Sequence, residues 1–324
     1  MEKKDLRIVF FGTPEFAVAS LDTLVTAGYN IVAAVTMPDK PAGRGHKMYH
    51  SPVKEYAVAH DIPLLQPVRL KDETFVNDLR ALEADLFIVI AFRMLPEVVW
   101  TMPSLGTFNL HASLLPRYRG AAPINWAVIN GDTETGVTTF FLKHEIDTGD
   151  IIDQERIAIL PTDNVGDVHD KLMELGAKLT LKTVDAIVEG NVNPIPQEKL
   201  LNGETATPAP KIFKETCRID WSKSALEVHN LVRGLSPYPA AWSEIHSEET
   251  TEALPVKIFT TELCGICPET SLPGELFIDN NDMKVCCGDG HLLRILELQP
   301  AGKKRMTADA FMRGARLNPL ARVK

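Results

Sequence analysis

The five-residue run Leu86–Ile90, LFIVI, contains no polar residue. A strand that exposes one face to water alternates apolar and polar side chains, so a wholly apolar strand must be covered on both faces, as in parallel sheets flanked by helices. Two further β-rich segments, Leu6–Phe11 and Ile31–Val35, enclose a stretch with apolar residues at helical spacing. This alternation predicts an α/β fold with a doubly wound, Rossmann-like parallel sheet.

One common function of such a sheet is disfavoured by the first turn. Dinucleotide binding requires Gly-x-Gly-x-x-Gly after the first strand, and only Gly12 stands there. The sequence therefore argues against a nicotinamide-dependent dehydrogenase.

Candidate catalytic side chains gather in the segment FNLHASLLPRYRG. In extended backbone alternate residues share a face, so Asn109 and His111 are expected to project together. An amide that donates to a developing oxyanion, beside an imidazole that moves protons, suits acyl or formyl transfer. Asp147, in the turn sequence Asp-Thr-Gly-Asp, is the candidate carboxylate to fix the imidazole tautomer. From the spacing alone, a purely structural hydrogen-bonded pair remains the alternative.

Two segments that follow expected strands are candidates for ligand binding, because open α/β sheets bind ligands at the carboxyl ends of their strands. The segment after Leu86–Ile90 contributes Phe92 and Leu95, for which ordinary core packing is the alternative. The loop after the polar pair contributes Ser113, Leu114, Leu115 and Pro116.

The length of 324 residues suits two domains. Residues 190–210 contain four prolines and little periodicity, as expected of an interdomain linker. We therefore predict a catalytic domain over residues 1–189 and a second domain over residues 211–324. Beyond the linker, short strands separated by closely spaced turn signals predict a small β-barrel.

Charge is unevenly distributed along the chain. The formal net charge is −9, but residues 1–205 hold 19 Lys+Arg against 28 Asp+Glu, and the remainder hold 15 against 15. The segment from Arg294 onward has eight basic residues against two acidic ones. Such a local cationic surface can attract phosphates despite the net charge, or can serve only solubility.

A loop of some fifteen residues between Pro38 and Pro52 carries Lys40, Arg44 and Lys47. Structureless loops of this length inside a compact domain are often functional. Its composition suits a finger that becomes ordered on a polyanion, with a merely solvated insertion as the alternative.

The five cysteines all lie beyond residue 216, and their odd number does not suggest a secreted disulfide framework. Cys264, Cys267, Cys286 and Cys287 form two pairs, but the second pair is adjacent, which gives poor geometry for zinc. We expect buried or incidental thiols and no metal. The N-terminus lacks a signal-peptide pattern, and no apolar run reaches the roughly 20 residues that cross a bilayer. We expect a cytoplasmic protein with no membrane and no evident obligate protein partner.

Four blocks resemble the methionyl-tRNA formyltransferase family: FGTPEFA, NLHASLLPRYRGAAPINWAVINGDTETGVT, DTGDI and LQPAGKKRM. The similarity covers nearly the whole chain. It implies transfer of a formyl group from 10-formyltetrahydrofolate to the α-amino group of methionyl-initiator-tRNA. It also implies that Asn109, His111 and Asp147 are catalytic, and that the C-terminal domain is an OB-like barrel that meets tRNA.

The resemblance implies further residue roles. The segment with Phe92 and Leu95 would help to enclose the folate, and Ser113 to Pro116 would line its site. Contacts to tRNA would come from Arg44, Lys47, Lys303, Lys304 and Arg305. The chain departs from the family pattern at Arg93 and at Glu145-Ile146, where glycine is common, so the Arg93 side chain has no expected role.

Two other functions stay open. A folate-dependent formyltransferase acting on a nucleotide-linked amine would share the catalytic residues, but the basic loop and the C-terminal barrel argue against it. A non-catalytic RNA-binding protein would have no need of Asn109, His111 and Asp147. Failure to bind any folate would favour this last function.

Overall fold

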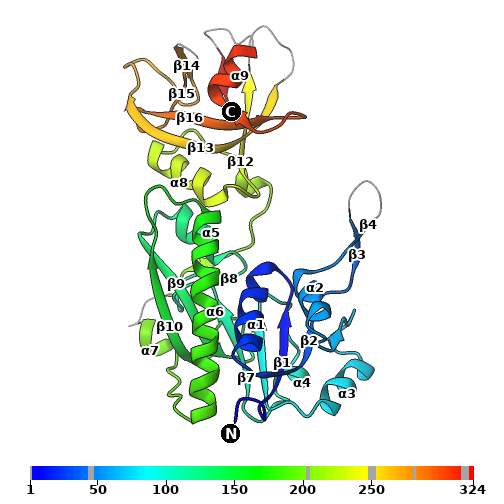
Figure 1. Ribbon diagram of the computed structural model, residues 1–324. Coiled ribbons are helices and arrows are strands. Elements are labelled where there is room, and N and C mark those ends of the chain that lie inside the picture. Colours follow the sequence, from blue (N-terminus) through cyan, green and yellow to red (C-terminus); the bar gives the residue numbers. More distant parts are fainter. Residues whose placement is uncertain (1, 43–46, 202–204, 247–252, 280–281, 315–320) are drawn as a thin grey trace. The chain divides into compact units, whose positions relative to one another are not determined.

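The computed structural model describes residues 2–42, 47–201, 205–246, 253–279, 282–314 and 321–324 (Figure 1). The chain forms two compact units, each assembled from separate segments. The N-terminal unit comprises Met1–Gly120, Thr135–Ile157 and Asp170–Pro208, and the C-terminal unit comprises Ala121–Glu134, Ala158–His169 and Ala209–Lys324. Most of the segment predicted as a linker, residues 190–208, therefore groups with the N-terminal unit.

A seven-stranded sheet with the order β10-β9-β7-β6-β1-β2-β5 forms the centre of the N-terminal unit. Its strands are β1 (Arg7–Gly12), β2 (Asn30–Val35), β5 (Leu64–Leu65), β6 (Leu86–Ile90), β7 (Thr107–His111), β9 (Glu134–Phe141) and β10 (Ile151–Ala158). The pairings from β5 to β7 are parallel, which confirms the doubly wound sheet. At the other side, β9 pairs antiparallel with β7, an addition that the sequence did not predict. All five residues of β6 are buried, as their unbroken apolar pattern predicts.

Helices complete this unit. They are α1 (Glu15–Thr26), α2 (Pro52–Ala59), α3 (Glu73–Ala81), α4 (Glu97–Trp100), α6 (Val165–Glu189, which begins in the C-terminal unit) and α7 (Glu198–Leu201). The N-cap of α3 is Asp72, whose carboxylate accepts from two backbone N–H groups of the first turn. Gly176 of α6 lets that helix approach β7, because a Cβ there would lie 2.7 Å from Leu110 Cδ2. Among the helices described, none has the length and apolar character to cross a membrane.

The basic loop is partly structured. β3 (Lys40–Ala42) and β4 (Lys47–Tyr49) pair antiparallel, so the expectation of a structureless finger is wrong at its base. The base is held by Asp39, whose carboxylate contacts Lys54 and His50, and hydrogen bonds from its neighbours lower the pKa of that carboxyl. Arg44 lies outside the described residues, and only the backbone of Lys47 is described.

The C-terminal unit is built on a second, antiparallel sheet with the order β14-β15-β16-β13-β12-β18, and β17 pairs with β16. The elements that follow residue 120 in or beside this unit are α5 (Pro123–Ile129), the 3-10 helix η1 (Glu215–Cys217), α8 (Ala225–Leu235), β12 (Ala241–His246), β13 (Leu254–Ile266), β14 (Leu276–Asp279), β15 (Asp282–Cys286), β16 (His291–Pro300), β17 (Met306–Thr307), α9 (Ala308–Gly314) and β18 (Arg322–Val323).

Hydrogen bonds between the two ends of this sheet bring it close to a closed barrel. The Val323 N–H donates to the Gly274 carbonyl over 2.8 Å, and the Leu276 N–H donates to the Ala321 carbonyl over 3.3 Å. α8 packs on the sheet and begins with a capping box, in which Ser224 and Glu227 satisfy each other's backbone N–H groups. The predicted small barrel is therefore confirmed as a nearly closed antiparallel sheet.

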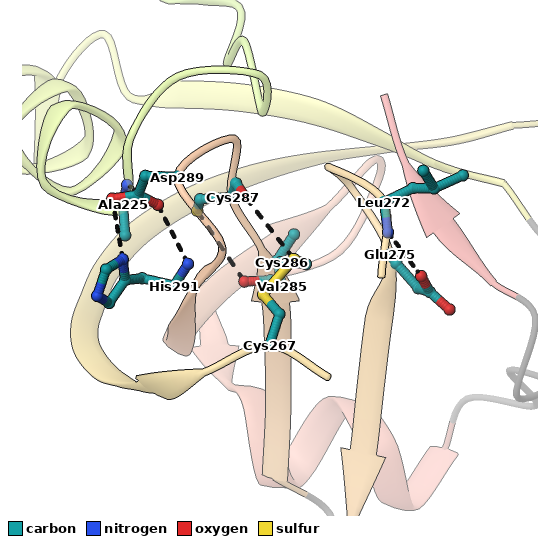
Figure 2. Close-up of a disulfide and its surroundings, with 9 residues drawn as sticks. All are labelled: Ala225, Cys267, Leu272, Glu275, Val285, Cys286, Cys287, Asp289 and His291. Carbon is teal, nitrogen blue, oxygen red and sulfur yellow. Dashed lines mark hydrogen bonds and ion pairs between the residues drawn. A yellow bond between two sulfur atoms is a disulfide. The ribbon is translucent and has the colours of Figure 1, made fainter. Parts of the chain in front are cut away.

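Two of the five cysteines form a disulfide, although the sequence predicted unpaired thiols. Figure 2 shows that Cys267 and Cys286 form a disulfide, with a Cα–Cα distance of 5.8 Å. The prediction of unpaired thiols is therefore wrong for these two, and it holds for Cys217, Cys264 and Cys287. Burial raises the pKa of the Cys287 thiol to about 12, so this residue stays protonated. Within the described residues no cluster of His, Cys, Asp or Glu could hold a metal ion.

Candidate active site

Asn109 and His111 lie on β7, near the carboxyl end of that parallel strand. In the register of the sheet, Asn109 is opposite Val89 of β6 and His111 is opposite Thr138 of β9. The Asn109 side chain is half-buried, and among the described residues no group hydrogen-bonds its amide. This amide is therefore free to donate to a ligand at the carboxyl edge of the sheet.

The imidazole of His111 is buried and its orientation is fixed by the backbone. Its Nε2 lies 2.8 Å from the carbonyl oxygen of Tyr118, and the side chain is 7% exposed. Because a carbonyl oxygen only accepts hydrogen bonds, Nε2 must carry the proton. In the neutral ring the lone pair is therefore on Nδ1, and Nδ1 is the atom that can accept a proton.

Asp147 faces this second nitrogen at a distance. Its Oδ2 lies 3.9 Å from His111 Nδ1, which is too long for a hydrogen bond but close enough to stabilise a protonated ring. The same oxygen accepts the backbone N–H of Gly120 over 3.0 Å. The prediction that Asp147 fixes the tautomer is wrong, because the Tyr118 carbonyl does so. A catalytic role for Asp147 stays a prediction, and this geometry leaves only electrostatic stabilisation of a protonated ring.

The backbone around these groups adopts strained conformations. Tyr118 has φ +61° and Asp147 has φ +55°, a region that residues with a Cβ rarely adopt. Residues held this way persist where the surrounding structure imposes the conformation, and they cluster at functional sites. Gly149 is needed for another reason, since a Cβ there would lie 1.6 Å from the Phe141 carbonyl oxygen. The Asp-Thr-Gly-Asp segment therefore forms a turn that is sterically constrained at Gly149, and its rigidity stays a prediction.

The loop from Ser113 to Pro116 follows His111. Hydrogen bonds and apolar packing within the N-terminal unit hold it in place. The Ser113 hydroxyl donates to the Arg117 carbonyl, and Leu115 packs with Phe140 and Ile151. Thr138 Oγ1 accepts the Leu115 N–H and donates to the Ser113 carbonyl. Ser113, Leu115 and Pro116 are buried and Leu114 is half-buried. Lining of a ligand site by this loop stays a prediction.

The segment after β6 shows how Arg93 is used. Its guanidinium donates to the carbonyls of Pro67 and Val68 over 2.7 and 3.0 Å and lies over the Phe92 ring. Phe92 is half-buried against Phe11, and Leu95 is 6% exposed within the same apolar cluster. Core packing thus accounts for Leu95, and Arg93 fastens this segment to the loop before α3.

Sequence reasoning missed two residues that support the Asp147 turn. Gln197 is fully buried and donates to the carbonyls of Asp147 and Gly149, and Arg119 donates to the Gln197 side chain. Gln197 lies in the proline-rich segment, about 50 residues beyond the turn, and no sequence pattern connects the two.

The basic residues near the C-terminus differ in whether they form an ion pair. Lys303 and Lys304 are exposed, and neither forms an ion pair with any residue that the structure describes. Arg305 pairs with Glu297 and lies over the Phe259 ring, 4.4 Å from its centroid. This pairing neutralises part of the Arg305 charge, so the two lysines are the stronger candidates for contacts with a polyanion.

Comparison with known proteins gives matches along the chain. Residues 6–184 match the family described as formyl transferase, and residues 211–316 match the formyl transferase C-terminal domain. The chain is 60% identical to a methionyl-tRNA formyltransferase of Bacteroides fragilis, covering 100% of this chain and 99% of that protein. A protein of the same name from Flavobacterium johnsoniae is 51% identical, with 100% of both chains covered. The solved structure of WlaRD, a sugar 3N-formyl transferase, covers 92% of this chain and 99% of its own with TM-score 0.65 and 18% identity, which supports the fold.

The fold and the residues at the carboxyl edge of its sheet, together with these matches, define a formyl-transferring enzyme. The similarity to the curated relatives extends over the full length of both chains and includes the C-terminal unit. The chain belongs to the methionyl-tRNA formyltransferase family.

Proposed function

We propose that this chain transfers the formyl group of 10-formyltetrahydrofolate to the α-amino group of methionine carried by initiator tRNA. The observation that carries the proposal is the full-length identity of 60% to a relative of that name. The free Asn109 amide beside the His111 imidazole supports it, because these are the groups that formyl transfer needs.

Asn109 would stabilise the charge that develops during the reaction. The folate supplies the formyl carbon in an activated form, and the α-amine attacks that carbon as the neutral amine, which is well populated because free α-amino groups titrate near pH 8. Electron density then moves onto the formyl oxygen. The Asn109 amide, unpaired and half-buried, would donate to that oxygen.

His111 would move the proton of the attacking amine. The Tyr118 carbonyl holds the ring with Nε2 protonated, so Nδ1 accepts the proton when the new C–N bond forms. Asp147, 3.9 Å from Nδ1, would stabilise the imidazolium. The proton then passes to the folate nitrogen as its bond to the formyl carbon breaks, which returns His111 to its starting form.

The folate would bind at the carboxyl edge of the sheet, between the segment after β6 and the loop after β7. The half-buried Phe92 and Leu114 side chains are apolar surfaces for a flat ring, and Ser113, Leu115, Pro116 and Leu95 would shape the walls from behind. The unpaired Asn109 amide between these two segments is the structural feature that fits a bound formyl group.

Methionyl-initiator-tRNA would contact basic residues of both units. In the C-terminal unit, Lys303 and Lys304 are exposed, and Arg305 would contribute less because Glu297 pairs with it. In the N-terminal unit the hairpin β3–β4 would contribute Arg44 and Lys47. We further propose that residues 1–189 carry the chemistry, that 211–324 bind tRNA, and that the reaction takes place in the cytoplasm.

The test is formylation by the purified full-length chain with 10-formyltetrahydrofolate and three acceptors in parallel. We expect methionyl-initiator-tRNA to be formylated, and methionyl-elongator-tRNA and a nucleotide-linked amino sugar to react far more slowly. Formylation of the amino sugar alone would favour the second type of formyltransferase. Tight, salt-sensitive tRNA binding without formylation or folate binding would favour an RNA-binding protein.

A further inference from the structure

A buried side-chain amide joins the Asp147 turn to an arginine. Gln197 has no exposed surface, although it comes from the proline-rich segment of residues 190–210. Its Oε1 accepts from Arg119 Nε over 3.0 Å and from Arg119 Nη2 over 2.7 Å. Its Nε2 donates to the carbonyls of Asp147 and Gly149, each over 2.8 Å.

The chemistry of these partners allows only an amide at this position. A guanidinium only donates hydrogen bonds, and a carbonyl oxygen only accepts them. The bridging side chain must therefore accept at one end and donate twice at the other. A carboxylate would keep the arginine but face two carbonyls with no donor, and an apolar side chain would leave buried polar groups unpaired.

The contacts of Gln197 form a closed ring with the catalytic carboxylate. Arg119 is followed by Gly120, whose N–H donates to Asp147 Oδ2, and the Asp147 carbonyl accepts from Gln197, which returns to Arg119. The Gly120 N–H therefore holds the carboxylate of Asp147, and the neighbouring Arg119 holds its backbone through Gln197. This matters because Asp147 has φ +55° and its carboxylate stands off from His111 Nδ1 by 3.9 Å, a separation that a small rotation would change.

The segment that carries Gln197 is itself fastened to the N-terminal unit on both sides. Ile195 and Ile151 exchange two backbone hydrogen bonds of 2.9 and 2.8 Å, and the Arg119 N–H donates to the Thr207 carbonyl over 3.1 Å. Backbone hydrogen bonds thus hold the chain two residues before Gln197 and again at Thr207.

We propose that Gln197, anchored by Arg119, is a positioning residue for Asp147. It touches no reacting atom; it holds the carboxylate where it stabilises the protonated His111. This inference rests on the proposed formyl transfer.

The test compares Gln197→Glu and Gln197→Met with the wild type in single-turnover formylation, with enzyme in excess of tRNA and saturating folate, and in steady-state assays that give the KM values. We expect the rate to fall about 10- to 100-fold, as for a catalytic group displaced by a fraction of an ångström, with the KM for both substrates changed less than about 3-fold. The matched control is Asn230→Asp, because Asn230 is a buried amide that accepts from Arg233 over 2.9 Å in the C-terminal unit. We expect that control to stay within about 2-fold of the wild type.

The same substitutions are then made in an Asp147→Ala background. If Gln197 acts through Asp147, they cause no further loss there, whereas groups that act independently give losses that multiply. An equal loss in both backgrounds, including one caused by impaired folding, would overturn the inference, and so would wild-type rates for both Gln197 variants. Absence of formylation by the wild type would instead contradict the proposed function.

Discussion

The polar and charged groups of interest are buried in the N-terminal unit and exposed to solvent in the C-terminal unit. In the N-terminal unit, His111 and Gln197 are buried, Asp147 is nearly so, and each is fixed by backbone groups. In the C-terminal unit, Lys303 and Lys304 are exposed, and the buried Trp221 Nε1 donates to the Ser243 hydroxyl inside the barrel.

This difference reflects what each task demands. Stabilising a developing charge requires groups that are already oriented and shielded from water, since their effect depends on position within a fraction of an ångström. Attracting a polyanion works over several ångströms and tolerates flexible side chains. Substitutions at the buried residues around His111 and Asp147 should therefore change kcat, and substitutions on the surface of the second unit should change the KM for tRNA.

The largest effect is expected at Asn109. Removing its amide in Asn109→Ala should lower kcat about 10²- to 10³-fold with little change in either KM, because the lost hydrogen bond forms mainly in the transition state. Steady-state kinetics measure this. Thr107→Val is the matched control on the same strand, since the Thr107 hydroxyl donates to the Trp100 carbonyl and is not at the site. A loss at Asn109 that appeared only in KM would contradict the assignment.

An intermediate effect is expected on the surface of the C-terminal unit. The double substitution Lys303→Ala, Lys304→Ala should raise the KM for tRNA about 5- to 20-fold at low salt and flatten its salt dependence, since fewer counterions are released on binding. Initial rates at several salt concentrations test this. Arg305→Ala should do less, because Glu297 already pairs with Arg305. An effect on kcat alone would remove the distinction between the two units.

A smaller, purely structural effect is expected at the start of α8. Ser224→Ala removes the N-cap and half of a capping box, which should lower the free energy of unfolding by about 1 kcal/mol. Denaturant unfolding measures the change, and Ser224→Asp should restore most of it. Unchanged stability of Ser224→Ala would show that tertiary packing alone fixes this helix end.

The smallest effect concerns pH. Burial lowers the pKa of His229 in the folded chain below its usual value near 6.5. The unfolded chain then takes up a proton first, so this residue reduces stability as pH falls below about 6.5 until it is protonated in the folded chain too. His229→Gln should make the decline in melting temperature between pH 7.5 and 5.5 shallower. An identical decline would assign the acid sensitivity to other groups.

The sequence predicts features that depend on local periodicity, and it does not predict contacts that depend on long-range folding. The buried strand β6 and the shared face of Asn109 and His111 follow from local periodicity, which is why they are predictable. The partner of His111 is not, because it is a backbone carbonyl aimed by the positive φ of Tyr118. Gln197 meets Asp147 only through long-range folding, and the pairing of Cys267 with Cys286 likewise depends on how β15 is placed.

The measurement that tests the central claim most directly is single-turnover formyl transfer to methionyl-initiator-tRNA by His111→Ala, with the enzyme in excess of the tRNA and the folate saturating. If the buried imidazole moves the proton of the amine, the rate should fall about 100-fold or more while tRNA and folate still bind with near wild-type affinity. A wild-type rate in this variant would contradict the assignment of the chemistry to the carboxyl edge of the N-terminal sheet.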